Sequence, residues 1–535
     1  MRTTWMLAGV LAVSASAMAS PNVPFTTVFD STDSFGGNQI IGPIQVVVGT
    51  GGDVFTNALL DDGNPIIVYS TPIANTQLFN SQAVAETNTP TVNLLANPQF
   101  STFDNLALAQ NSATGARLFF AAQASAANGG AGGYGIVQLD IAGGVPTLSN
   151  VAFDGTGSYS FSGANSVINP DGTISLQVDA GGQALFPANT SSTPGVLVRG
   201  NAASTSQVFT PANPPTLANA TFRDGLGNEV PSLTTPTAVA QLSAAGGQGV
   251  YKLSGASQTL ISGALAPASS GASMVMGYTS TGSFSAALML GQGTGGGFTQ
   301  NVVLSKNGGA PQPILANSTT SITPGSGKSA LGELSPQGKI ALFVPDGTSD
   351  ANDTVQYADA TAVSPIASVI AAVNTDVTAP SYTKVALSDG TPLPIIGLQF
   401  GGSVWVPEVN NAGTIIFNAE VYDASLSSDE QALLEWTPAD AGSSPTVLLE
   451  TGQPADLNGT PSSSPVYGFT LSDLAQESDF YKNSVSDDNY IGVGVFYDDG
   501  SSAVLITPVA QVPEPASMAL ISIAGLGFLA RRRRI

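Results

Sequence analysis

A short polar turn followed by an apolar strand recurs between about residues 23 and 508, and this repeat limits the fold more than any other feature of the sequence. Asn410-Asn411-Ala412-Gly413 precedes TIIFNAEVY, and Asn169-Pro170-Asp171-Gly172 precedes TISLQV. The Asn or Asp side chain accepts hydrogen bonds from the backbone two residues later, and Gly supplies the positive φ that closes the turn. Apolar residues never keep helical spacing for several turns in this region. The pattern therefore predicts an almost entirely β body.

The turns also predict which strands pair. Two apolar strands that are separated by a Gly-rich or polar connection are expected to form an antiparallel pair. We count eight units of this kind, with a spacing of roughly 50 to 75 residues. The predicted partners are residues 116–123 with 134–139, 173–178 with 195–198, 237–242 with 249–253, 414–422 with 431–436, and 491–497 with 503–507.

A repeat of three- to four-stranded units favours a β-propeller-like array of seven or eight blades, because radial repetition leaves few exposed sheet edges. The alternatives are tandem β-sandwiches and a β-solenoid. Solenoid rungs would be shorter and more regular than these units. Sandwiches would need linkers rich in Pro and Ser, for which Thr210–Pro215 is one candidate.

The C-terminal end has a different character from the body. Val512-Pro513-Glu514-Pro515 leads into Ala516–Ala530, which contains no charge, and the chain then continues with Arg531, Arg532, Arg533 and Arg534. An uncharged segment of this kind favours hydrocarbon, and the arginines should stay on the cytoplasmic side. Fifteen residues make a helix of roughly 22 Å, shorter than a hydrocarbon core of roughly 30 Å. A transient stop therefore fits this predicted apolar helix better than a permanent anchor, which is the alternative.

The order of these parts resembles the PEP-CTERM sorting signal of Gram-negative bacteria. The resemblance implies that an exosortase cuts near Val512–Pro515 and that the body is sent outward. In that family such proteins accompany exopolysaccharide and biofilm production. The N-x-x-G turns resemble those of tandem-repeat PEP-CTERM proteins, although Ser335 and Asp61 replace the Asn in two units.

The N-terminal residues predict a secretory signal helix. Met1 and Arg2 give a short positive region, Trp5–Val13 is apolar, and Ala17-Met18-Ala19 before Ser20 is a small-x-small site for signal peptidase. We therefore expect a signal peptide at 1–19, a repeat domain at 20–508 and the sorting signal at 509–535. The precursor should be held in the inner membrane by its C-terminal helix alone, and the mature form should be at the cell surface or extracellular.

Charge and composition exclude several classes of function. The chain has a formal net charge of −23 and contains neither His nor Cys. Loss of Arg2 and of the four C-terminal arginines leaves nine basic residues against 37 acidic ones, a net charge near −28. Such a body repels nucleic acid and anionic lipid. The missing His and Cys exclude Ser-His-Asp and Cys-His nucleophiles and most zinc sites.

Three candidate sites are left by this composition. Asp346, Asp350, Asn352 and Asp353 could form a calcium clip outside the EF-hand pattern, or a solvated acidic loop. Paired carboxylates could hydrolyse a glycoside if they lie about 5–10 Å apart, and the candidates are Glu408, Glu420, Glu435 and Glu450. Trp405 and Trp436 could stack on a sugar, although core packing is the expected role.

Together these features predict an exported, exosortase-processed surface or extracellular-matrix protein with a structural, adhesive or binding role in an exopolysaccharide or biofilm. We expect no enzymatic activity and no obligatory cofactor, and extracellular polysaccharide is the candidate ligand. The alternative is an extracellular carbohydrate-active hydrolase that uses paired carboxylates.

Overall fold

A computed structural model describes residues 24–508 except for internal stretches, of which the longest are 87–98, 210–220, 261–272, 316–329 and 472–483. Between 209 and 275 it describes the backbone of the strands without their side chains. The regular elements in the described part are 37 β-strands and three single 3-10 turns, without an α-helix. The predicted all-β body is therefore confirmed. The predicted signal helix and apolar C-terminal helix lie outside the described residues.

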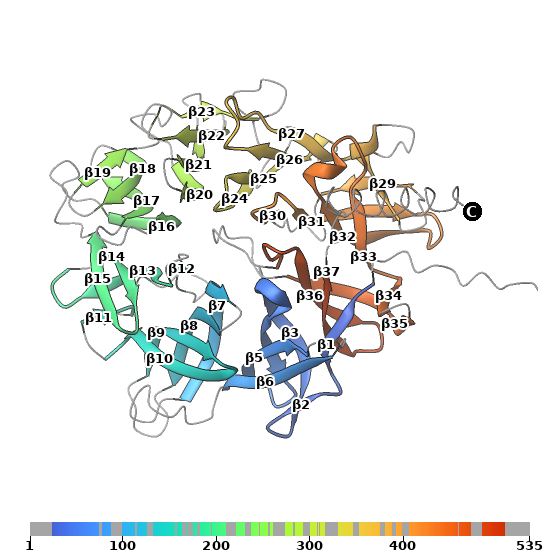
Figure 1. Ribbon diagram of the computed structural model, residues 1–535, viewed down its shortest axis with the longest axis horizontal. Helices are drawn as coiled ribbons and strands as arrows, with labels where there is room; N and C mark the ends of the chain where they lie inside the picture. Colours follow the sequence, from blue (N-terminus) through green and yellow to red (C-terminus); the bar gives the residue numbers. More distant parts are fainter. Residues whose placement is uncertain are drawn as a thin grey trace, which may run out of the picture.

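The described strands form eight sheets, which stand radially around a common axis (Figure 1). This arrangement confirms the propeller-like fold, and eight is one of the two blade numbers expected from the turn repeat. We number the sheets in chain order. Sheet 1 contains β2 (Ser34–Phe35), β3 (Asn38–Val48), β4 (Val54–Leu60), β5 (Pro65–Pro72) and β6 (Phe79–Glu86), with η1 (Thr50–Gly52) between β3 and β4. Sheet 2 contains β7 (Gln99–Ser112), β8 (Gly115–Ser125), β9 (Gly133–Ala142) and β10 (Val145–Phe153).

The next four sheets follow the same antiparallel plan. Sheet 3 contains β11 (Tyr159–Ser160), β12 (Gln177–Val178), β13 (Ala184–Thr190), β14 (Val196–Asn201) and β15 (Ser204–Phe209). Sheet 4 contains β16 (Thr221–Val230), β17 (Thr237–Ala244), β18 (Gly247–Ser254) and β19 (Ser257–Leu260). Sheet 5 contains β20 (Ser273–Thr281), β21 (Phe284–Gln292), β22 (Gln300–Lys306) and β23 (Gln312–Pro313). Sheet 6 contains β24 (Leu331–Leu334), β25 (Lys339–Val344), β26 (Thr354–Asp359) and β27 (Ser368–Ala372).

The last two sheets are less regular. Sheet 7 contains β28 (Lys384–Ala386), β29 (Pro392–Gly397), β30 (Glu408–Val409), β31 (Ile415–Asp423), β32 (Ser428–Trp436) and β33 (Thr446–Glu450). The turns η5 (Ser381–Thr383) and η6 (Pro438–Asp440) flank its strands. Sheet 8 contains β34 (Pro454–Leu457), β35 (Thr460–Thr470), β36 (Tyr490–Tyr497), β37 (Ser502–Pro508) and, from the start of the chain, β1 (Thr26–Asp30).

Four of the five predicted strand pairs are confirmed: β8 with β9, β17 with β18, β31 with β32, and β36 with β37. The predicted pairing of 173–178 with 195–198 is wrong, because β13 lies between these segments and pairs with both β12 and β14. Pro187 and Asn189 interrupt the apolar pattern of β13. Residues of those types are depleted in strands, which hides this one in the sequence.

The hydrophobic core lies between neighbouring sheets and is divided into layers. In β25, Ile340 and Leu342 pack with sheet 5, whereas Ala341 and Phe343 pack with sheet 7. Successive side chains of a strand point to opposite faces, so both faces of β25 are covered. This explains why its sequence, KIALFV, is a nearly continuous apolar run instead of an alternating one.

The ring is closed by a strand from each end of the described chain. β1 pairs antiparallel with β37, with Thr26 opposite Ile506 and Asp30 opposite Ala503. A Cβ on Gly492 of β36 would lie 2.3 Å from Val48 Cγ2, so sheet 8 approaches sheet 1 as closely as a glycine allows. We call the contact between sheets 8 and 1 the seam. Tandem sandwiches and a solenoid are excluded, because both lack such a closure.

Candidate functional site

The turn at Asp61–Asn64 lies at the opposite end of β4 from residues 49–52. Polar turns of sheets 6, 7 and 8 lie at the same end of the ring as residues 49–52. In three of them the fourth residue donates its backbone N–H to the carbonyl oxygen of the first: Gly338 to Ser335 (2.9 Å), Gly413 to Asn410 (3.1 Å) and Asn489 to Ser486 (3.0 Å). The fourth residues have φ of 83°, 93° and 67°, respectively. Gly and Asn tolerate this left-handed conformation best.

The first side chain of each turn caps the strand that follows. Asn410 Oδ1 accepts hydrogen bonds from the backbone N–H groups of Ala412 (3.0 Å) and Thr414 (2.9 Å). Ser335 Oγ accepts from Lys339 N–H at 3.0 Å, and Ser486 Oγ accepts from Tyr490 N–H at 2.9 Å. Serine therefore performs the same task as asparagine, which explains why the sequence departs from a strict N-x-x-G.

Neighbouring turns are also bonded to one another. Gln337 N–H donates to Asn411 Oδ1 (2.9 Å), Asn411 Nδ2 donates to Asp487 Oδ2 (2.7 Å), and Gly51 N–H donates to Asp488 Oδ2 (2.7 Å). The turns of sheets 6, 7, 8 and 1 thus form one hydrogen-bonded series. We call this series the turn row, and its members are Ser335–Gly338, Asn410–Gly413, Ser486–Asn489 and 49–52.

A second set of links lies beside the turn row. Glu333 Oε2 accepts from Val409 N–H, and Glu408 Oε2 accepts from Ser484 N–H, each at 2.9 Å. Both glutamates are buried. A buried carboxylate needs such donors, so these residues join successive sheets. Sequence reasoning missed Glu333, although it stands two residues before its turn just as Glu408 does.

The four glutamates considered for glycoside hydrolysis are spread over sheet 7. Glu408 and Glu435 lie in one row, on either side of Ile416. Glu420 is four residues further along β31, about 13 Å away at the rise of a strand. Glu450 pairs with Ala432, which is opposite Ala419, so its side chain is on the other face from that of Glu420. Glu408 and Glu435 are therefore the two candidates closest to one another in register. The Glu408 carboxylate already accepts a hydrogen bond from Ser484 N–H.

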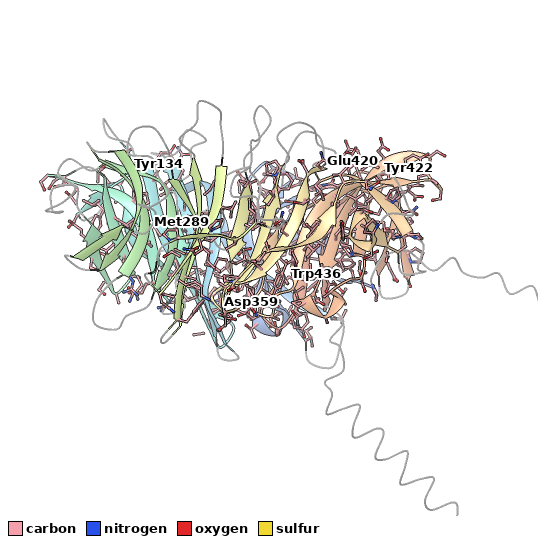
Figure 2. The ribbon with its side chains drawn as sticks, turned by 90° about the horizontal axis from the view of Figure 1, so that it is seen from above. Tyr134, Met289, Asp359, Glu420, Tyr422 and Trp436 are labelled. Carbon is pink, nitrogen blue, oxygen red and sulfur yellow. The ribbon has the colours of Figure 1, made fainter. Side chains whose placement is uncertain are left out.

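Glu450 is part of an acidic cluster at the opposite end of sheet 7 from the turn row. Glu420 and Tyr422, at that end of β31, lie on one side of the ring, whereas Asp359 and Trp436 lie on the other (Figure 2). Glu450 has 0% exposure, and neither of its carboxylate oxygens has a hydrogen-bond partner. Burial, together with the charges of Asp423 and Glu430, raises its pKa to about 8. Glu450 is therefore predominantly protonated at neutral pH.

The other two acids of this cluster are satisfied by neighbouring donors. Asp423 accepts from Ser425 N–H (2.7 Å) and Gln453 Nε2 (3.1 Å). Glu430 accepts from the hydroxyls of Ser428 and Thr451. Among the described residues no group of three or more Asp or Glu is arranged to hold a metal ion. The cluster therefore has the features of a protonated buried acid beside two hydrogen-bonded acidic side chains.

The predicted calcium clip is only partly described. Asp346 and Asp350 lie outside the described residues, whereas Asn352 is exposed and Asp353 is fully buried. Trp436 is 4% exposed and packs against Tyr357 with ring centroids 5.1 Å apart, which confirms its expected core role. Trp405 lies outside the described residues.

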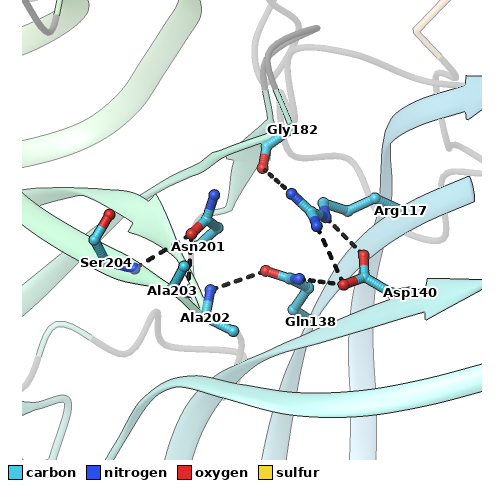
Figure 3. Close-up of polar contacts among 8 residues, drawn as sticks. All are labelled: Arg117, Gln138, Asp140, Gly182, Asn201, Ala202, Ala203 and Ser204. Atoms are coloured by element: carbon cyan, nitrogen blue, oxygen red, sulfur yellow. Dashed lines mark hydrogen bonds and ion pairs between the residues drawn. The ribbon is translucent and has the colours of Figure 1, made fainter.

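A polar network joins sheets 2 and 3 (Figure 3). Arg117 binds both carboxylate oxygens of Asp140, at 2.6 and 3.2 Å, and its Nη1 donates to the carbonyl oxygen of Gly182. Gln138 donates to Asp140 Oδ2 and accepts from Ala202 N–H. The polar groups of this network are hydrogen-bonded to one another, so the network holds sheets 2 and 3 in position.

Replacing Asn410 with alanine should test the turn row. The side chain is buried and also donates to the carbonyl oxygen of Ser486 at 2.9 Å. Its loss should lower the free energy of unfolding by about 2–4 kcal/mol, because buried backbone donors lose their acceptor. Asn410→Ser should recover about half of the loss, as Ser335 and Ser486 cap their own strands. Urea denaturation measures the free energy of unfolding of both variants. Equal losses for Asn410→Ala and Asn410→Ser would contradict the capping role of the Asn410 side chain.

The sequence-predicted sorting residues Val512–Pro515 and Arg531–Arg534 lie outside the described residues, as do Ala17, Ala19 and Ser20. A helix with the length and apolar character needed to cross a bilayer is not found among the described residues. The geometry above therefore concerns the body between these two ends.

Comparison with known proteins gives one family match. The model of the PEP-CTERM protein-sorting motif matches residues 511–534. The resemblance of the body to tandem-repeat PEP-CTERM proteins is not confirmed, because the matched residues are at the C-terminal end. No curated protein sequence matches the chain.

Comparison with solved structures gives matches of low identity and low TM-score. A puromycin-hydrolysing peptidase of Mycobacterium tuberculosis shares 12% identity over 67% of this chain and 54% of its own, with a TM-score of 0.29. This chain thus spans about half the length of that peptidase. A PL25 ulvan lyase shares 8% identity (91% and 96% coverage, TM-score 0.34), and the polysaccharide lyase Uly1 shares 10% (78% and 98%, TM-score 0.38). By its own sheet arrangement and the motif match, the protein is a propeller-like all-β chain that carries a PEP-CTERM protein-sorting motif, which implies exosortase-dependent export of a membrane-held precursor.

Proposed function

We propose that the mature protein is a non-enzymatic, structural or adhesive component of the cell surface or the extracellular matrix. The observation that carries the proposal is the sorting motif at 511–534, which begins three residues after the last strand of the ring. A motif in this position delivers the body that precedes it to the outside.

The character of the body supports this role. With 37 acidic residues and few basic ones, it stays soluble and repels other anionic surfaces. The closed ring protects most sheet edges, which limits aggregation of an exported β-protein. His and Cys are absent from the sequence, and Glu408 is committed to a neighbouring sheet. Polysaccharide remains the proposed ligand, and an exopolysaccharide matrix the proposed setting.

Mass spectrometry of the protein recovered from the native cell surface tests the proposal. We expect an N-terminus at Ser20, a new C-terminus between Val512 and Pro515, and loss of Arg531–Arg534. A strain that lacks exosortase activity is the control and should accumulate the chain with its arginine tail. A surface protein that keeps Arg531–Arg534 would overturn the proposal and leave a permanently anchored protein.

A further inference from the structure

Both ends of the described chain leave the ring at one place. Thr507 Oγ1 donates to the carbonyl oxygen of Pro24 at 2.9 Å, so the residues just before β1 lie beside the end of β37. Pro508 in turn pairs with Tyr490, whose N–H is bonded to Ser486 of the turn row. The chain therefore enters and leaves sheet 8 beside the turn row.

The two predicted processing points are close to this place along the chain. Ser20 is four residues before Pro24, and Val512 is four residues after Pro508. At about 3.3–3.6 Å per extended residue, four residues reach at most about 14 Å. Pro515 is seven residues after Pro508, so an enzyme that cuts between Val512 and Pro515 must work within about 14–25 Å of the seam.

The cut does not require any strand of the ring to be released. β37 ends at Pro508, before the motif, and its residues Val504 and Leu505 are fully buried. On the other side of the pair, Val28 and Phe29 of β1 pack with Val504 and Ile506 in the core layer of the seam. Burial of each such side chain contributes about 1.5–3 kcal/mol, so closure is strongly favoured once β37 has crossed the membrane.

From these observations we propose that exosortase receives the closed ring, with β1 already paired to β37, and that the turn row faces the membrane when the tail is cut. This inference rests on the proposed processing route and adds to it the folded state and the orientation of the substrate. Asp487 and Asp488 of the turn row accept hydrogen bonds from Asn411 and Gly51, so both carboxylates are bonded within the turn row.

A disulfide between β1 and β37 tests whether exosortase accepts the closed ring. Thr26 and Ile506 are Cα partners, and antiparallel partners lie within the Cα separation that a disulfide needs. The chain has no native cysteine, so Thr26→Cys/Ile506→Cys offers one pairing. The bond is confirmed by a mobility shift on non-reducing gels. We expect the locked precursor to lose its tail within about twofold of the rate of each single variant.

Accumulation of the locked precursor with its tail, while both single variants are processed, would overturn the proposal, because the ring would then have to open first. If the wild-type chain also kept its tail, the processing route itself would fail, which is a different result. The two failures are therefore distinguishable by the single variants.

Fluorescence quenching tests the orientation. A fluorophore on Thr50→Cys reports on the turn row, and one on Asp498→Cys reports on the turn between β36 and β37 at the other end of the same sheet pair; both positions are exposed. In full-length precursor reconstituted into phosphatidylethanolamine–phosphatidylglycerol vesicles with a spin-labelled lipid, quenching should be at least about threefold stronger at position 50. Equal quenching, or stronger quenching at position 498, would overturn the proposed orientation.

Discussion

Replacement of Phe25 with alanine should lower the free energy of unfolding by about 3–5 kcal/mol, the range for truncation of a fully buried aromatic side chain. Phe25 has 0% exposure and packs in the core layer between sheets 7 and 8. Its N–H also donates to the carbonyl oxygen of Asp456 at 2.7 Å, which ties the start of β1 to β34. The effect should be large because Phe25 joins β1 to a sheet made from the other end of the chain.

Tyr467→Ala is the matched control for this prediction. Tyr467 is an aromatic residue of the same sheet, but it is 73% exposed, so its loss should change the free energy of unfolding by less than about 0.5 kcal/mol. Guanidinium denaturation followed by tryptophan fluorescence measures both variants. Equal, small changes would mean that β1 contributes little to the closure of the ring.

The sequence predicts the local structure of this protein better than its long-range contacts. The turn before β31 can be recognised in the sequence because Asn410 and Gly413 act within four residues. Four of the five predicted strand pairs are confirmed as well. The closure between β1 and β37 joins residues almost 480 positions apart. The sequence of β1, TTVFD, does not indicate whether this strand joins the edge of the last sheet or begins a sheet with the strands that follow it.

The functional residues likewise divide into those that a local pattern predicts and those whose role depends on long-range contacts. The motif at 511–534 is recognisable because its three parts are consecutive in the chain. The roles of the glutamates cannot be recognised in this way. The alternation of side chains along β31, β32 and β33 decides which face of the sheet each glutamate occupies. Glu408 and Glu450 look alike in sequence, yet one accepts a hydrogen bond from Ser484 and the other has no partner for its carboxylate.

Stability should fall as the pH rises from about 4.5 to about 8, and Glu450 should be a main cause. Its pKa in the folded protein is about 8, because of its burial and the charges of Asp423 and Glu430, whereas its ordinary value is 4.5. Between these values the folded state holds a proton that the unfolded state releases. The stability associated with the protonated acid is thus fully present below pH 4.5 and is lost as the pH rises through about 8.

Glu450→Gln separates this effect from the titration of all other groups. Each pH unit of the shift corresponds to about 1.4 kcal/mol, so the wild-type protein should lose on the order of 3–5 kcal/mol between pH 4.5 and 9 through this residue. The glutamine variant cannot ionise at this position, so its loss of unfolding free energy over this pH range should be smaller by that amount. The exposed control Asp498→Asn should lose as much unfolding free energy as the wild type. Urea denaturation at half-unit pH steps measures the three curves. Parallel curves for Glu450→Gln and the wild type would show that Glu450 ionises at its ordinary pH. In that case a donor must reach its carboxylate, and the acidic cluster of sheet 7 would be an ionised site instead of a protonated one.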